Sequence, residues 1–143
     1  MSAMLRAFQR KMAVGQGISS EKMEAIAKAV VDAAYKVHTT LGPGLLESVY
    51  EVCLLHELMK RGFRVERSVA VPVMYDNVEI QKAFEIDLLV EGCIIVELKS
   101  IEVILQKHKS QLLTYLKLAG CRLGFLINFN EALIRDGIHR KIL

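Results

Sequence analysis

The spacing of hydrophobic residues changes twice along the chain. Between residues 20 and 60, apolar side chains recur every three or four positions, which is typical of amphipathic helices. The segment LGPG at 41–44 divides this region into two helices, and Gly62 ends the second one. Residues 63–100 then alternate or run continuously apolar and contain many β-branched residues, which predicts three strands.

Helical spacing returns after these strands. Residues 104–119 predict a helix that ends at Gly120, and the apolar run CRLGFLINF predicts a strand covered on both faces. The tail DGIHRKIL leaves room for one more short strand. Pro72 indicates that the first strand lies at a sheet edge or contains a bulge. We therefore expect an α/β fold with the order α-α-β-β-β-α-β and a mixed sheet flanked by helices.

Residues 1–18 precede the first helix and end in GQG. We expect an N-terminal arm or extension here, with residues 19–143 forming a single domain. The alternatives for the arm are an amphipathic segment, translation from an upstream start codon, a leftover of cloning, or a cleaved targeting peptide.

Composition narrows the class of protein. The chain is 52% hydrophobic with only two prolines, which favours a filled core over disorder. No uncharged apolar run is long enough for a membrane span, and residues 1–20 lack the apolar segment of a secretory signal. The cysteines (Cys53, Cys93 and Cys121) form no CxxC pair, which indicates reduced core residues. We expect a cytoplasmic protein with no membrane partner.

The net charge of +3 comes entirely from residues 1–17, because these contain Arg6, Arg10 and Lys11 and no acid. The rest of the chain is neutral overall. A polyanionic partner would therefore need a local basic patch, such as a cluster of Lys107, Lys109, Lys117 and Arg122.

The segment FEIDLLVEGCIIVELKS at 84–100 reads as a hydrophobic hairpin with charged residues inside it. A two-residue turn would place Asp87 opposite Val96 and Glu97 opposite Ile86. A three-residue turn over 91–93 would instead place Asp87 opposite Glu97. Since a one-residue slip moves every side chain of a strand to the other face, the two registers differ completely.

Only the three-residue turn separates the charges from the apolar residues. It gives one face that carries Glu85, Asp87, Glu97 and Lys99, with Glu85 opposite Lys99. The other face pairs aliphatic residues: Ile86, Leu88 and Val90 with Leu98, Val96 and Ile94. We predict this turn, or an equivalent bulge, with Gly92 at positive φ.

Two carboxylates on opposite strands repel each other unless a cation lies between them or one takes a proton. Oxygen ligands suit Mg²⁺ or Mn²⁺ better than Zn²⁺. On the same face, Lys99 could polarise a metal-bound water or stabilise negative charge on phosphorus. The alternative is a salt bridge between Lys99 and Asp87 or Glu97 on a solvated face.

Two helical segments add polar residues to this hairpin. GPGLLESVYE contains Gly44, Glu47 and Tyr50 as G-x-x-E-x-x-Y, with Glu47 and Tyr50 on one helix face. HKSQLLTYL contains Gln111 and Tyr115 as Q-x-x-x-Y, with His108 one turn earlier. The alternatives are a first-turn glutamate that complements the helix dipole, and polar residues at the edge of an amphipathic helix.

Together, these motifs resemble the PD-(D/E)xK nuclease superfamily in its RecB-like branch. LGPGLLESVYE, EIDLLV, VELKS and QLLTYLKL are similar to the family named after its GxxExxY motif, over about residues 24 to 143. The resemblance implies a restriction-endonuclease-like core. Ile86 stands where the proline of the motif would be, and the iron–sulfur cysteines of some RecB-like relatives have no counterpart.

The resemblance also implies roles for the site residues. Asp87, Glu97 and Glu47 would be metal ligands, and the Leu98 carbonyl a further ligand. Lys99 would be the catalytic lysine. Two helix residues would position the phosphate backbone or this lysine: Gln111 and Tyr115.

We therefore predict a nuclease that uses Mg²⁺ or Mn²⁺ to hydrolyse phosphodiester bonds in nucleic acid, with DNA favoured over RNA. Beside two carboxylates, Lys99 is expected to act electrostatically rather than as a base. The alternative function is a non-catalytic module of the same fold that acts in protein assembly or nucleic-acid binding. The arm, six methionines and the apolar composition would suit a homodimer.

Overall fold

The computed structural model describes all residues from Met1 to Leu143, and a five-stranded sheet forms its centre. The strands are β1 (Val65–Tyr75), β2 (Val78–Val90), β3 (Ile94–Lys99), β4 (Leu123–Asn128) and β5 (Ile138–Ile142). They follow one another across the sheet in chain order, and only the β3–β4 pair is parallel. The predicted mixed sheet is thus confirmed, and the tail forms the extra strand β5.

A parallel pair requires a crossover connection, and α4 (Gln106–Ala119) supplies it between β3 and β4. The other helices are α1 (Ala3–Gln16), α2 (Ser20–Leu41) and α3 (Glu47–Lys60), and a short 3₁₀ turn (Ile134–Asp136) precedes β5. None of the helices combines the length and apolar composition that crossing a membrane would require.

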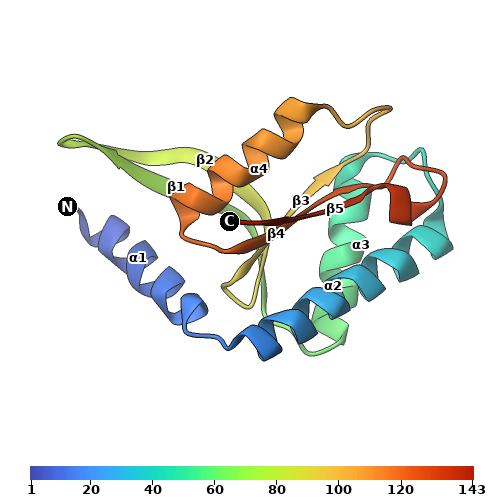
Figure 1. Cartoon of the computed structure of the whole chain (residues 1–143), viewed down its shortest axis with the longest axis horizontal. Coiled ribbons are helices and arrows are strands. Elements are labelled where there is room, and N and C mark those ends of the chain that lie inside the picture. Colours follow the sequence, from blue (N-terminus) through green and yellow to red (C-terminus); the bar gives the residue numbers. More distant parts are fainter.

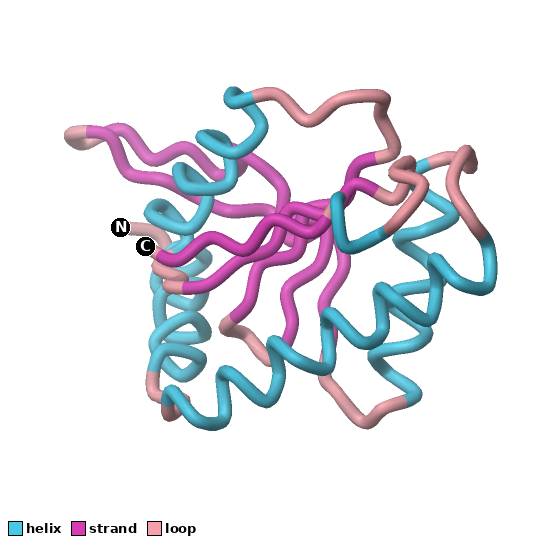
Figure 2. The backbone as a smooth tube through the Cα atoms, turned by 45° about the vertical axis from the view of Figure 1, so that its right-hand side comes forward, coloured by secondary structure: helices cyan, strands magenta, loops and turns pink.

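The helices cover the sheet on both faces (Figures 1 and 2). On β3, Val96 belongs to the core that α2 and α3 share with the sheet, while its neighbour Ile95 belongs to the core that includes α1 and α4. Because neighbouring residues of a strand point to opposite faces, these cores lie on opposite sides of the sheet. The site residues of β2 and β3 therefore lie between two helical layers.

The hairpin of β1 and β2 extends beyond the rest of the sheet (Figure 1). β1 is an edge strand, and its register with β2 shifts between Val71 and Val73, at Pro72. The prediction of an edge position or a bulge at Pro72 is confirmed, since the proline has no N–H for the ladder and both features are present. The hairpin tip carries exposed apolar side chains, with Tyr75 71% and Val78 60% exposed.

The N-terminal segment forms the amphipathic helix α1, which packs against the sheet. Ser2 caps this helix by accepting a hydrogen bond from the Leu5 N–H (3.1 Å), and its hydroxyl donates to Glu79 of β2 (2.6 Å). Met12 is buried in the same core as α4. At the end of the helix, Gly15 packs so closely on the β2–β3 turn that a Cβ would lie 2.0 Å from the carbonyl oxygen of Gly92.

Candidate active site

The β2–β3 hairpin has the register predicted from the sequence. Leu88 pairs with Val96 and Val90 pairs with Ile94, so the turn contains three residues, 91–93. Gly92 has φ 63°, as predicted, and Glu91 also has a positive φ of 51°. The Glu91 carboxylate accepts a hydrogen bond from the Arg64 N–H (2.8 Å), which fixes the turn from outside.

The backbone pairing of β2 and β3 ends at Leu88 and Val96. Beyond this pair, hydrogen bonds from backbone N–H groups to two carboxylate side chains join the strands instead. The Asp87 N–H donates to Glu97 Oε1 (3.1 Å), and the Leu98 N–H donates to Asp87 Oδ2 (2.9 Å). Each carboxylate therefore accepts a hydrogen bond from the opposite strand. The second oxygen of each accepts no hydrogen bond from a protein N–H or hydroxyl group.

Part of the predicted face pattern is wrong. Leu88 and Val90 lie in the core under α2 and α3 as expected, but Ile86 lies in the opposite core, beside Val69 and Val71. Glu85 forms an ion pair with Lys82 (2.7 Å) instead of facing Lys99. The predicted pairs of Ile86 with Leu98 and of Glu85 with Lys99 do not form, because the strands separate past Leu88.

The neighbouring strand β1 explains why Ile86 and Leu88 lie on opposite faces of the sheet. Arg67 pairs with Leu88 and Val69 pairs with Ile86, so Ser68 stands opposite Asp87, and it has a positive φ of 55°. This left-handed residue interrupts the alternation of side chains, since Arg67 reaches Glu51 of α3 whereas Val69 enters the core under α4. Asp87 lies where β2 makes the same change of face.

Burial and charge act together on Glu97. Glu97 is only 6% exposed, and burial raises the pKa of its carboxyl group, with the neighbouring Asp87 raising it further. The positive charge of Lys99 partly offsets this rise in the pKa of Glu97. Lys99 forms no ion pair with either acid, so the salt bridge considered as an alternative is absent from this arrangement.

Glu47 is the first residue of α3 and lies near the pair. Burial raises the pKa of Glu47, the Asp87 charge raises it further, and Lys99 lowers it. No group of three or more His, Cys, Asp or Glu side chains is close enough together to hold a metal ion. The structure therefore brings Asp87 and Glu97 into contact and leaves Glu47 beside them.

The two helix residues from the Q-x-x-x-Y motif differ in their surroundings. Tyr115 stacks on Phe84 of β2, with ring centroids 4.0 Å apart. Burial raises the pKa of Tyr115, and the charges of Glu97 and Asp87 raise it further, which places the phenol near the acidic pair. Gln111 is exposed. His108 accepts a hydrogen bond from the Leu105 N–H (2.9 Å), so it caps α4.

The sequence pattern does not predict the surroundings of three residues around this site. It indicates only a strand for Phe84 and regular alternation at Ser68. Tyr50, one turn after Glu47 on α3, is fully buried, with its ring stacked on Phe129 at 4.6 Å. A signal for Tyr50 was present in the sequence, because a tyrosine one turn after a glycine-rich loop can reach back to the loop backbone.

Comparison with known proteins decides the family of this fold. A family model described as the PD-(D/E)XK nuclease superfamily matches residues 24–141. The chain belongs to this superfamily. No curated protein and no solved structure was found to match. The mixed sheet flanked by helices is the restriction-endonuclease-like fold of PD-(D/E)XK nucleases.

PD-(D/E)XK nucleases generally use divalent metal ions, and the donor set of this chain fits such an ion. Asp87 and Glu97 offer hard carboxylate oxygens, each with one oxygen free of protein donors. A divalent ion would also offset the repulsion between these two neighbouring carboxylates. The superfamily implies a nucleic-acid substrate.

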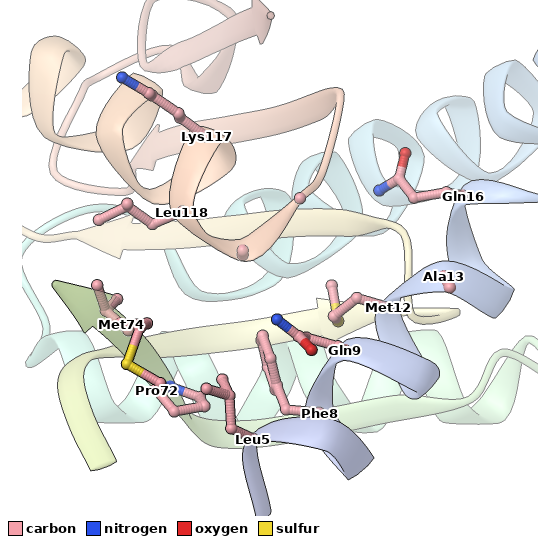
Figure 3. A pocket seen from close by; sticks show the side chains of 13 residues that line it. Leu5, Phe8, Gln9, Met12, Ala13, Gln16, Pro72, Met74, Lys117 and Leu118 are labelled. Atoms are coloured by element: carbon pink, nitrogen blue, oxygen red, sulfur yellow. The ribbon is translucent and has the colours of Figure 1, made fainter. Parts of the chain in front are cut away.

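A cavity of about 470 Å³ lies elsewhere, between α1, β1 and the end of α4. Figure 3 shows side chains of α1, among them Phe8 and Met12, on one side of this cavity and Pro72 and Met74 of β1 on another. None of the candidate site residues lines it. The acidic pair instead lies where β2 and β3 separate.

Proposed function

We propose that this PD-(D/E)XK protein is a Mg²⁺- or Mn²⁺-dependent nuclease that hydrolyses phosphodiester bonds in DNA. The observation that carries the proposal is the contact between Asp87 and Glu97 across the β2–β3 hairpin, with Lys99 on the same strand as Glu97. The GxxExxY and Q-x-x-x-Y motifs support assignment to the GxxExxY family and the RecB-like branch. We take residues 19–143 as the nuclease domain and residues 1–18 as an extension.

In this proposal, four groups would hold the metal: the carboxylates of Asp87, Glu97 and Glu47 and the Leu98 carbonyl. A divalent ion bound there would neutralise the scissile phosphate and lower the pKa of a water molecule. The Lys99 ammonium then stabilises the negative charge that develops on the phosphate oxygens. Two residues of α4 orient the substrate backbone: Gln111 and Tyr115.

Lys99 is assigned an electrostatic role because its neighbours are acidic. Preorganised positive charge beside the reacting phosphate stabilises the negative charge that develops there. The positive charge of Lys99 acts on both Glu97 and Glu47, where it lowers the pKa of each carboxyl group. A charged Lys99 is therefore suited to phosphate binding.

The test is a cleavage assay with the full chain on single-stranded DNA, double-stranded DNA and RNA, with Mg²⁺, Mn²⁺ or EDTA. We expect metal-dependent cleavage of DNA that is lost in Asp87→Ala and Lys99→Ala. Glu85→Ala is the matched control, because Glu85 lies on the same strand and pairs with Lys82 instead. Cleavage that survives both site substitutions would contradict the assignment, and preference for RNA would correct the substrate.

A second candidate function is a non-catalytic module of the same fold that acts in assembly, as a homodimer, or in nucleic-acid binding. The exposed apolar tip of the β1–β2 hairpin, with Tyr75 and Val78, favours a protein contact. Absence of cleavage on every substrate, together with dimers in sedimentation that Tyr75→Ser abolishes, would favour this alternative. We place either activity in the cytoplasm, where its three free cysteines would stay reduced.

A further inference from the structure

Tyr50, the tyrosine of the GxxExxY motif, faces the loop before α3 rather than the acidic pair. Its hydroxyl donates a hydrogen bond to the carbonyl oxygen of Gly42 (2.6 Å) and accepts one from the Leu45 N–H (3.1 Å). The ring is fully buried and stacks nearly parallel on Phe129, at 11°. The hydroxyl thereby connects the loop at 42–45 to the helix that follows it.

The carbonyl group of Leu45 accepts a hydrogen bond from a residue that is distant in the sequence. Ser100 Oγ donates a hydrogen bond to the Leu45 carbonyl oxygen (2.6 Å), across 55 positions of sequence. Ser100 directly follows Lys99 at the end of β3. The peptide groups on both sides of Leu45 are therefore fixed, one by Tyr50 and one by Ser100.

The end of β3 that carries Ser100 is itself held in place. The Phe129 N–H donates to the carbonyl oxygen of Lys99 (2.9 Å). The fully buried Asn128 accepts a hydrogen bond from the Ile101 N–H (3.1 Å) and donates one to the Ile101 carbonyl oxygen (2.9 Å). Ser100 thus extends from a segment whose backbone is anchored on both sides.

Glu47 depends on this connection because the start of α3 lacks a side-chain cap. Leu46 occupies the N-cap position and forms no capping hydrogen bond. The loop before it contains Gly42 and Gly44 at φ 75° and 96°, so its own conformational preferences are weak. Glu47 follows Leu45 by two positions, and the fixed backbone of Leu45 therefore determines where Glu47 starts the helix.

We propose that Ser100 and Tyr50 are positioning residues that hold Glu47 beside Asp87 and Glu97. They tie the Glu47 loop to the strand end that carries Glu97 and Lys99, and they act through Glu47 without touching metal or substrate. This inference rests on the proposed metal-dependent nuclease function. It assigns the tyrosine of the GxxExxY motif a structural role, which is to fix the loop that precedes Glu47.

The first experiment titrates Mn²⁺ against the full chain and follows the thermal midpoint. Ser100→Ala should weaken Mn²⁺ binding about tenfold, since loss of a group that orients a ligand typically costs ten- to a hundredfold in affinity. Ser100→Thr keeps the hydroxyl and should restore binding. Thr114→Ala is the matched control, because it also removes a hydroxyl that donates to a backbone carbonyl, that of Ser110.

The second experiment asks whether Ser100 acts through Glu47. In a Glu47→Gln background, adding Ser100→Ala should cause no further loss of Mn²⁺ affinity, because the residue that Ser100 positions has already lost its charge. Tyr50→Phe should behave in the same way, with its ring stack retained. Losses that add fully in the double variants would overturn the proposal.

Hydrogen exchange tests the connection without any metal. Ser100→Ala and Tyr50→Phe should speed the exchange of amides at residues 45–48, while amides in α4 stay unchanged. Unchanged exchange at 45–48 would overturn the inference even if the protein binds Mn²⁺. If the wild type binds no Mn²⁺ and cleaves no substrate, the proposed function itself fails, and the positioning role falls with it.

Discussion

The two strands that carry the acidic pair are built differently. β3 alternates regularly, with Val96 and Leu98 in the core under α2 and α3 and Ile95 in the core under α4, and it pairs with β4 along its whole length. β2 changes face at Asp87, opposite the left-handed Ser68. The regular strand fixes Glu97 by its place in the sheet, whereas Asp87 depends on a local distortion.

This difference matters for the site. A residue on a regular strand points to one face only, but Asp87 lies where β2 changes face, between the helical layers. Its charge acts on Glu47 of α3 on one side and on Tyr115 of α4 on the other. We infer that the distortion at Ser68 lets a single carboxylate serve residues from both layers.

The largest expected effect comes from removing Asp87 itself. Asp87→Ala should lower DNA cleavage by about a thousandfold or more, since it removes a proposed metal ligand and the acceptor for the Leu98 N–H. Single-turnover cleavage with Mg²⁺ measures this effect. Glu85→Ala, two positions earlier on the same strand, should remain within about twofold of wild type. Equal losses in both variants would mean that general damage to β2 explains the result.

Substitution at Ser68 tests the distortion directly. Ser68→Val should cost about 1–2 kcal/mol of stability, because a β-branched side chain resists positive φ, and should lower cleavage about ten- to a hundredfold by misplacing Asp87. Ser68→Gly should keep both stability and cleavage, since glycine adopts this backbone without strain. Denaturant unfolding and the cleavage assay provide the two measurements.

The regular strand offers the matching control. Ile95→Val on β3 should cost about 0.5–1.5 kcal/mol of stability, because Ile95 is fully buried, and should leave cleavage near the wild-type level. If Ile95→Val and Ser68→Val lowered cleavage to the same extent, the distinction between a regular and a distorted strand would lose its functional meaning.

The last prediction concerns stability alone, as a pH dependence that arises from Glu97. Burial and then Asp87 raise its pKa above the ordinary 4.5, so above that pH the unfolded chain releases a proton that the folded chain keeps. The unfolded state binds fewer protons, and stability without metal should fall as pH rises, by at most about 1.4 kcal/mol per pH unit. Thermal midpoints in EDTA from about pH 5 to about pH 8 test this.

One variant and one metal condition sharpen the pH experiment. Glu97→Gln should flatten the decline, because the titrating group is gone while an oxygen remains to accept from the Asp87 N–H. Saturating Mn²⁺ should also abolish the decline in the wild type, since bound metal requires the deprotonated carboxylate and the folded and unfolded chains then carry the same charge at Glu97. A decline that persists unchanged in Glu97→Gln would assign it to other groups.

The two strands also explain how far sequence reasoning reached. The register of the β2–β3 hairpin followed from separating charged from aliphatic residues, which is a strong constraint when one face is buried. The change of face at Ser68 did not follow, because the letters VERSVAV alternate acceptably as a regular strand. Positive φ at a serine leaves no mark in a polar and apolar pattern.

Helical spacing had a similar limit. The spacing of three residues correctly placed Glu47 and Tyr50 close together around the helix axis. It could not say which of them faces the core: Tyr50 is fully buried, and Glu47 is exposed. The contact between Ser100 and Leu45 joins positions too far apart for any local pattern to predict.

The close contact of Gly15 with Gly92 has a practical consequence for protein engineering. The family match begins at residue 24, yet α1 lies before it and touches the turn that sets the register of the acidic strands. Trimming the chain to the matched region would remove Met12 from a core that it shares with Leu112 and Leu116 of α4. Boundaries for expression are better drawn from packing than from similarity.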